Sequence, residues 1–212
     1  MWTLPNILTL ARIGLAPVIA LLPFIQGYWP KVIAFAIFVV AAVSDVVDGY
    51  LARSRRQESD IGRLLDPVAD KLLLVATLVP IYWITRHPTV LYGIPWWGSL
   101  PLWVAVMLVG RELLMTLLRY EAKKRGIVIA AGREGKVKAV FQYIFIGATI
   151  AWFAWKDYIV TTRLTGHLRD LWDEVHGTVI AVTLGIAVVL TAYSFAVYLY
   201  KYRALFRNDA GR

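Results

Sequence analysis

Four aspartates at regular spacing are the residues in this chain best suited to chemistry. Asp45 and Asp48 lie three positions apart, and Asp66 and Asp70 lie four apart. On a helix, each spacing places both carboxylates on one face. Carboxylates grouped in this way repel one another unless most are protonated or a cation lies between them. Hard divalent metals are the natural partners of oxygen ligands, so the spacing predicts an acidic, metal-binding site.

The sequence around these aspartates is apolar enough to cross a lipid bilayer. Of the 212 residues, 59% are hydrophobic and 17% are charged, and the mean hydropathy is +0.61. An ionisable side chain costs about 2.5–3.5 kcal/mol at the centre of a bilayer, and such a residue therefore indicates a functional site. A structural contact between helices would account for one aspartate in this setting, but it does not explain four at this spacing.

The elements that must position the carboxylates are six predicted transmembrane helices. A helix needs roughly 20 residues to cross about 30 Å of hydrocarbon, and lipid leaves no alternative partner for the backbone. We expect spans near residues 7–27, 31–53, 66–86, 98–120, 137–156 and 178–200. No internal repeat or linker divides the chain, so one all-α integral membrane domain over residues 1–212 is the simplest interpretation.

Basic residues are distributed unequally between the two ends of this bundle. Fifteen fall on the side of the termini, namely Arg53, Arg55, Arg56, Arg63, Arg119, Lys123, Lys124, Arg125, Arg133, Lys136, Lys138, Lys201, Arg203, Arg207 and Arg212, against five on the other, Lys31, Arg86, Lys156, Arg163 and Arg169. The positive-inside rule then places both termini and the aspartates on the cytoplasmic side. Anionic lipids and substrates account for the net charge of +9 without a nucleic acid.

The polar segment 54–61 is predicted to be a cytoplasmic turn that makes the second and third spans antiparallel neighbours. The two aspartate pairs would then face each other, which is a common way to build a metal site in a helix bundle. Gly49 costs about 1 kcal/mol relative to alanine inside a helix, so its presence suggests that a ligand approaches the backbone closely. Ala52 and Gly62 fit the same purpose.

These residues match the pattern D-x2-D-G-x2-A-R-x8-G-x3-D-x3-D, and the chain resembles the CDP-alcohol phosphotransferases, integral membrane enzymes of phospholipid synthesis. All eight fixed positions are filled, by Asp45, Asp48, Gly49, Ala52, Arg53, Gly62, Asp66 and Asp70. The resemblance extends over the whole chain, because the core of that family is six transmembrane helices with this motif across the second and third.

The resemblance implies transfer of a substituted phosphate from a CDP-linked donor to an alcohol, with release of CMP. It implies two divalent cations, Mg²⁺ or Mn²⁺, held by Asp45, Asp48, Asp66 and Asp70. The residues it assigns to the donor are Asp48, Gly49, Ala52, Arg53, Gly62 and Asp66. Asp70 would also be the general base that takes the proton of the acceptor hydroxyl. Because the family is commonly homodimeric, a homodimer is expected.

Two further segments resemble the phosphatidylglycerophosphate synthase branch of the family, which transfers the phosphatidyl group of CDP-diacylglycerol to glycerol 3-phosphate and releases CMP. They are Gly-Arg-Glu at 110–112 and Gly-Lys-x-Lys-x3-Gln at 135–142. The cations predicted to bind the acceptor phosphate are Arg111, Arg119, Lys136 and Lys138. Alternatively, the two lysines are ordinary positive-inside charges and Arg111 is paired with Glu112. Ala139 departs from the Thr of many members.

The first span begins with Leu-Pro-Asn-Ile-Leu-Thr-Leu-Ala-Arg at 4–12, which also resembles the start of these synthases. Asn6, Thr9 and Arg12 are spaced by three and would line one helical face towards the site. The alternative is a helix cap at Asn6 and an Arg12 that snorkels to the membrane surface.

Other functions remain open at this point. A cardiolipin synthase of the same fold would accept phosphatidylglycerol, and phosphatidylserine or phosphatidylinositol-phosphate synthases share the core motif. A transporter or channel could use the aspartates as an ion relay, although this would leave the Gly-x2-Ala-Arg segment unexplained. The segment 157–177 contains three aspartates, a glutamate and two histidines, and we expect a solvated amphipathic connection there rather than a metal site.

Overall fold

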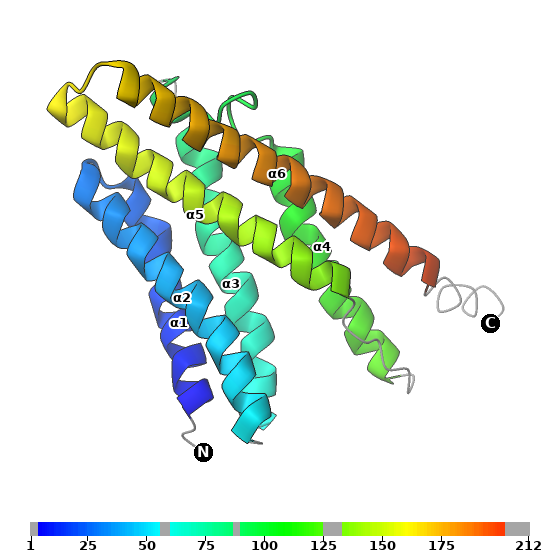
Figure 1. Ribbon diagram of the computed structural model, residues 1–212. Helices are drawn as coiled ribbons and strands as arrows, with labels where there is room; N and C mark the ends of the chain where they lie inside the picture. The colour runs from blue at the N-terminus through cyan, green and yellow to red at the C-terminus, as the bar shows by residue number, and fades with distance from the viewer. Residues whose placement is uncertain (1–3, 56–59, 87–89, 125–132, 202–212) are drawn as a thin grey trace.

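A computed structural model of the chain describes residues 4–55, 60–86, 90–124 and 133–201 (Figure 1). Within these ranges, the side chains left outside the description are those of residues 4, 5, 46–55, 60, 61, 63, 64, 90, 133, 134, 136 and 201. The described chain is helical, with one isolated β-bridge between Ile94 and Gly98. The prediction of an all-α fold is therefore confirmed.

Six long helices make up the fold, as the sequence predicts. They are α1 (Leu4–Leu21), α2 (Tyr28–Arg55), α3 (Asp60–Thr85), α4 (Leu102–Lys124), α5 (Arg133–Thr162) and α6 (His167–Lys201), with short 3-10 turns η1 (Leu22–Phe24) and η2 (Val90–Tyr92). Among the described residues, five apolar helical stretches are long enough to cross a membrane, at Asn6–Phe24, Tyr28–Asp45, Leu65–Thr85, Val137–Thr162 and His167–Tyr200. α4 is not among them, because Arg111, Glu112 and Arg119 interrupt its apolar run. A sixth crossing by α4 stays a prediction.

The last two helices are longer than the sequence predicts: much of the segment 157–177 is exposed, as expected, but most of it is helical rather than a connection. α5 and α6 are joined by residues 163–166 alone. Acidic side chains stabilise this end of the helix pair: Asp173 of α6 accepts hydrogen bonds from Trp155 Nε1 at 2.6 Å and Lys156 Nζ at 2.7 Å. Asp157 is buried against Lys31 and Tyr92. Charged residues continue the helices here because they find partners on neighbouring elements.

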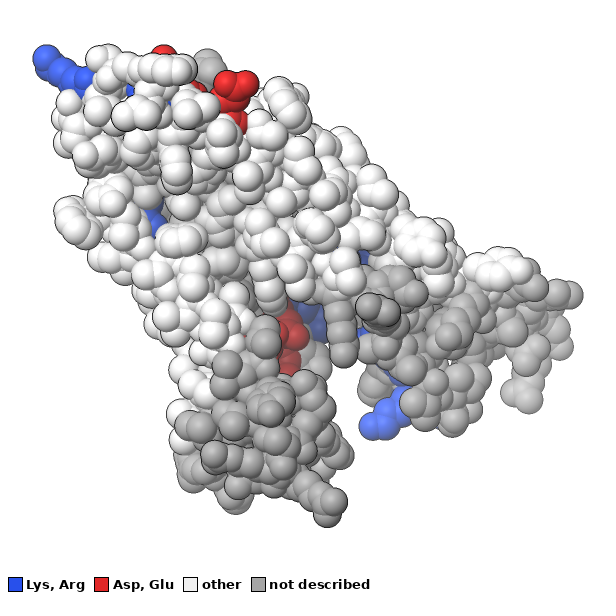
Figure 2. Space-filling view, viewed as in Figure 1, with Lys and Arg blue, Asp and Glu red and all other residues white. Residues whose placement is uncertain are grey.

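The helices run up and down, so alternate connections lie at opposite ends of the bundle (Figure 1). In this view, the start of α1, the end of α2 and the start of α3 lie close together at the lower end, whereas the end of α4, the start of α5 and the end of α6 lie on the right. Buried apolar side chains from all six long helices, among them Ile19, Phe38, Leu73, Leu108, Phe145 and Leu184, form the core between the ends. Figure 2 shows an uncharged surface over the middle of the molecule, with charged side chains at the upper end and in a recess below.

Candidate active site

Arg12 of α1 joins two of the predicted metal ligands. Its side chain is buried, and its Nη1 atom donates to Oδ1 of Asp45 on α2 and to Oδ1 of Asp70 on α3, the latter at 3.2 Å. Arg12 therefore does not snorkel to the membrane surface. Three helices converge on this one guanidinium group, so the fold brings together carboxylates that lie 25 positions apart in the sequence.

Thr9, one helical turn before Arg12, contacts a third aspartate of the predicted site, Asp66. Its hydroxyl donates to Oδ1 of Asp66 at 2.7 Å, and its side chain is buried. Asn6 is also buried, within α1 rather than at its cap. The three-residue spacing at the start of the chain thus produces a polar stripe, and two of its members bind aspartates of α2 and α3.

A cavity of about 370 Å³ places the acidic residues beside the cations predicted to bind the acceptor. Its walls come from α3, α4, α5 and α6, and they include Asp66, Asp70, Lys71, Arg111, Glu112, Thr116, Arg119, Gln142, Tyr143 and Tyr198. Carboxylates that could accept a proton and guanidinium groups that could bind an anion therefore face the same cavity. The arrangement suits the transfer of a group between two substrates that meet there.

The cations of α4 and α5 are linked through Glu112. Arg111 is buried and donates to Glu112 Oε1 at 2.9 Å, as the alternative interpretation of Arg111 supposed, but it also lines the cavity. Lys138 is buried and contacts the same oxygen, and it is absent from the described cavity wall. Arg119 lines the cavity and donates to the hydroxyl of Tyr198 at 3.3 Å.

Several residues of the cavity were not predicted from the sequence as site residues. Tyr143 and Tyr198 sit in apolar helical runs, where an aromatic residue is expected to pack or to face lipid. Lys71 directly follows Asp70, and a lysine within an apolar span is a signal that could have been used. Its Nζ donates to the carbonyl oxygen of Pro67 at 2.7 Å.

Part of the predicted site lies outside the described side chains, namely Asp48, Gly49, Ala52 and Arg53 of α2 and Lys136 of α5. Gly62 is described and is buried. Among the described residues, no group of three or more Asp, Glu, His or Cys side chains is arranged to hold a metal ion. The donor set nevertheless fits a hard divalent cation, because carboxylate oxygens from two helices already share one positively charged nitrogen of Arg12.

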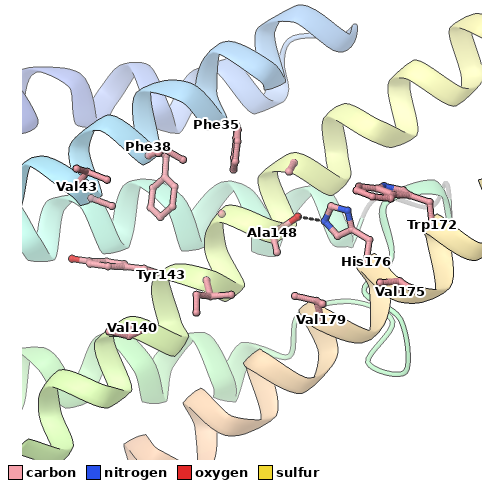
Figure 3. Close-up of a pocket in the computed structure, with 15 residues that line it drawn as sticks. Phe35, Phe38, Val43, Val140, Tyr143, Ala148, Trp172, Val175, His176 and Val179 are labelled. Atoms are coloured by element: carbon pink, nitrogen blue, oxygen red, sulfur yellow. Dashed lines mark hydrogen bonds between the residues drawn. The ribbon is translucent and has the colours of Figure 1, made fainter.

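An apolar groove of about 720 Å³ adjoins this site along α2, α5 and α6 (Figure 3). Phe35 and Phe38 line it from α2, Val140 and Tyr143 from α5, and Trp172, Val175 and Val179 from α6. His176 forms part of the wall, and its Nε2 donates to the carbonyl oxygen of Ala148 at 2.9 Å. Tyr143 lines both the groove and the polar cavity, so the two spaces adjoin at one side chain.

Comparison with known proteins identifies relatives over most of the chain. It is 34% identical over 206 residues to the CDP-diacylglycerol--glycerol-3-phosphate 3-phosphatidyltransferase of Escherichia coli K12, covering 96% of each protein. Two proteins of Arabidopsis thaliana with the same activity in their names are 34% and 32% identical over 153 and 202 residues, which are 70% and 94% of this chain. The matched parts span 64% and 62% of those plant relatives, less than two thirds of their length.

The family comparison agrees with the motif. Residues 2–193 match the CDP-alcohol phosphatidyltransferase family, a range that includes α1 to α5, most of α6, the acidic residues and every described residue of the cavity wall except Tyr198. The resemblance inferred from the eight fixed positions is therefore confirmed. This chain is a member of the CDP-alcohol phosphatidyltransferase family.

Proposed function

We propose that this protein transfers the phosphatidyl group of CDP-diacylglycerol to sn-glycerol 3-phosphate, giving phosphatidylglycerophosphate and CMP. The observation that carries the proposal is the 370 Å³ cavity, in which Asp66 and Asp70 face Arg111 and Arg119 beside an apolar groove. Relatives named for this reaction, one of them matched over 96% of its length, support the same substrates.

The cations of α4 and α5 are suited to bind the phosphate of the acceptor. Arg119 and Arg111 line the cavity, and a guanidinium group can donate two parallel hydrogen bonds to a phosphate. Lys138 is linked to Arg111 through Glu112, which both side chains contact. Lys136 belongs to the same proposed set, although its side chain lies outside the described residues. A phosphate held here would bring the glycerol hydroxyls towards Asp66 and Asp70.

The apolar groove is suited to hold acyl chains of the donor. Its walls are hydrophobic and aromatic side chains, and it meets the polar cavity at Tyr143 (Figure 3). A lipid with its tails along α2, α5 and α6 would place its diphosphate near the aspartates. By the family motif, the CDP part would contact Asp48, Gly49, Ala52, Arg53, Gly62 and Asp66.

Asp70 is proposed to accept the proton of the attacking hydroxyl. The hydroxyl oxygen forms a bond to the phosphorus of the phosphatidyl group, the phosphoanhydride bond breaks, and CMP leaves with the bonding electrons. Thr9 holds Asp66 in place through its 2.7 Å hydrogen bond, and Arg12 holds Asp45 and Asp70. Mg²⁺ or Mn²⁺ bound by Asp45, Asp48, Asp66 and Asp70 would supply charge neutralisation for the diphosphate and the leaving group.

The membrane arrangement is proposed from charge. Fifteen basic residues against five favour a cytoplasmic position for both termini and the site, in a multi-pass protein of the cell (inner) membrane. The same proposal includes a single domain of six transmembrane helices, in which α4 crosses the membrane in addition to the five apolar stretches. It also includes a homodimeric assembly.

The decisive experiment measures CMP release by the purified protein with CDP-diacylglycerol and Mg²⁺ or Mn²⁺, with glycerol 3-phosphate or phosphatidylglycerol supplied in parallel. We expect release that depends on glycerol 3-phosphate and on the metal. Release with phosphatidylglycerol but not with glycerol 3-phosphate would instead identify a cardiolipin synthase. The cationic residues would then only set the orientation of the protein in the membrane. Ion flux in liposomes without CMP release would favour a transporter.

A further inference from the structure

Arg12 is a buried cation within an apolar helix. It lies in the apolar stretch Asn6–Phe24 and is 2% exposed, although an arginine in such a stretch ordinarily extends to the membrane surface. Burial of this charge is tolerable because carboxylates surround it. One nitrogen atom, Nη1, contacts an oxygen of Asp45 and an oxygen of Asp70.

The geometry separates Arg12 from the cations expected to bind substrate. Arg111 and Arg119 line the 370 Å³ cavity, whereas Arg12 is absent from its described wall and contacts carboxylates. Arg12 therefore contacts ligands proposed for the metal rather than a substrate phosphate. Asp45 and Asp70, which would hold the metal ion, are thus already in contact with a cationic side chain.

We propose that Arg12 is a resident counter-cation, which holds Asp45 and Asp70 together before a divalent ion binds and competes with that ion for their oxygens. The inference rests on the metal-dependent function proposed above. Because a guanidinium group keeps its proton in proteins, Arg12 cannot withdraw by losing its charge and must move or share the carboxylates. Arg12 is thus a positioning residue that tunes how tightly the site binds metal.

Charge supports both parts of this role. When Asp45, Asp66 and Asp70 are all ionised, their three negative charges and the one positive charge of Arg12 leave two negative charges among these four side chains. Without Arg12 or a metal, the aspartates would repel one another. With Arg12 in place, an incoming cation meets a weaker field than the carboxylates alone would produce.

The test is a Mn²⁺ titration of the purified protein in detergent, monitored by the electron paramagnetic resonance signal of free Mn²⁺. We expect Arg12→Met to bind Mn²⁺ about tenfold more tightly than the wild type. In chelator its melting temperature should fall, and saturating Mn²⁺ should restore most of the difference. Arg12→Lys keeps the charge and should stay within about threefold of the wild-type affinity.

Lys31→Met is the matched control, because Lys31 is a second buried cation paired with an aspartate, at the other end of the bundle. Its melting temperature should fall equally in chelator and in Mn²⁺, with unchanged Mn²⁺ affinity. Where Arg12→Met does not give folded protein, the same titration of Arg12→Gln replaces it.

The outcomes distinguish the role of Arg12 from the proposed function. Unchanged or weaker Mn²⁺ binding by Arg12→Met or Arg12→Gln, in a wild type that binds Mn²⁺ and releases CMP, would overturn the role of Arg12 alone. Failure of wild type and variant alike to bind Mn²⁺ would overturn it together with the metal part of the proposed function.

Discussion

Asp157 and the aspartates of the site lie at opposite ends of the bundle and are satisfied in opposite ways. Asp157 accepts a hydrogen bond from the backbone amide of Gly27 at 3.1 Å and contacts both Lys31 and Tyr92. One carboxylate therefore has three donors, one of them charged. At the other end, Asp45 and Asp70 share a single nitrogen of Arg12.

The site aspartates, which have fewer donors, are also more exposed than Asp157. The Asp157 side chain is 9% exposed, whereas those of Asp45 and Asp70 are 30% and 48% exposed. Burial and the hydrogen bond to Asp157 raise the pKa of Tyr92 above its usual value, which keeps its hydroxyl available as a donor. Asp157 thus lies in a closed, charge-balanced network suited to stability, while the site keeps negative charge accessible to ligands.

The largest expected effect is a loss of turnover on substitution of an aspartate of the site. Asp70→Asn should lower kcat by about 10²–10⁴-fold, because the amide cannot accept the proton of the acceptor hydroxyl. The measurement is CMP release together with the melting temperature in chelator, which should change little. The control is Asp170→Asn, the same substitution at an exposed position of α6. Substantial remaining turnover would exclude Asp70 as the base.

Substitution of Asp157, at the other end of the bundle, should instead lower the stability of the protein. Asp157→Asn leaves Lys31 buried without a charged partner and should cost about 3–5 kcal/mol, which corresponds to a fall in melting temperature of about 10 °C. Thermal unfolding in detergent checks this, again with Asp170→Asn as control. The KM values of the folded fraction should stay unchanged. A large loss of kcat without a loss of stability would contradict the comparison.

The acceptor side of the cavity should show substrate selectivity. Arg119→Gln should raise KM for glycerol 3-phosphate about tenfold and leave KM for CDP-diacylglycerol nearly unchanged, because a charge-assisted hydrogen bond to phosphate is lost. Lys123→Gln, an exposed cation on the same helix outside the described cavity wall, controls for general electrostatics. Equal increases for both substrates would argue against an acceptor pocket.

The smallest effect is expected in the groove. Val179→Trp should narrow it and raise KM for long-chain CDP-diacylglycerol by a few-fold, roughly what 1 kcal/mol produces, with less effect on a short-chain donor. Val106→Trp, at an exposed position of α4 outside the groove, is the control. If both variants behave alike, the acyl chains lie elsewhere.

Much of the fold could be predicted from the sequence because bilayer physics leaves few choices. Long apolar runs must be helices, and helices joined by short connections alternate in direction. The ends of α5 and α6 differ from the expected spans because acidic residues such as Asp157 and Asp173 are typical of solvated connections between helices. Both aspartates lie in helices because other elements supply hydrogen-bond donors to them. Lys31 of α2 contacts Asp157, and Trp155 of α5 donates to Asp173 of α6.

The sequence by itself determined the family and the acidic motif, since residue types at fixed helical spacing define both. Tertiary structure decided which side chains meet: Arg12 with Asp45 and Asp70, Glu112 with Lys138, and Tyr143 between groove and cavity. Helical periodicity predicts the face on which a residue lies but not the partner that packs against it. That partner depends on how separate helices dock, which is a property of the packed bundle.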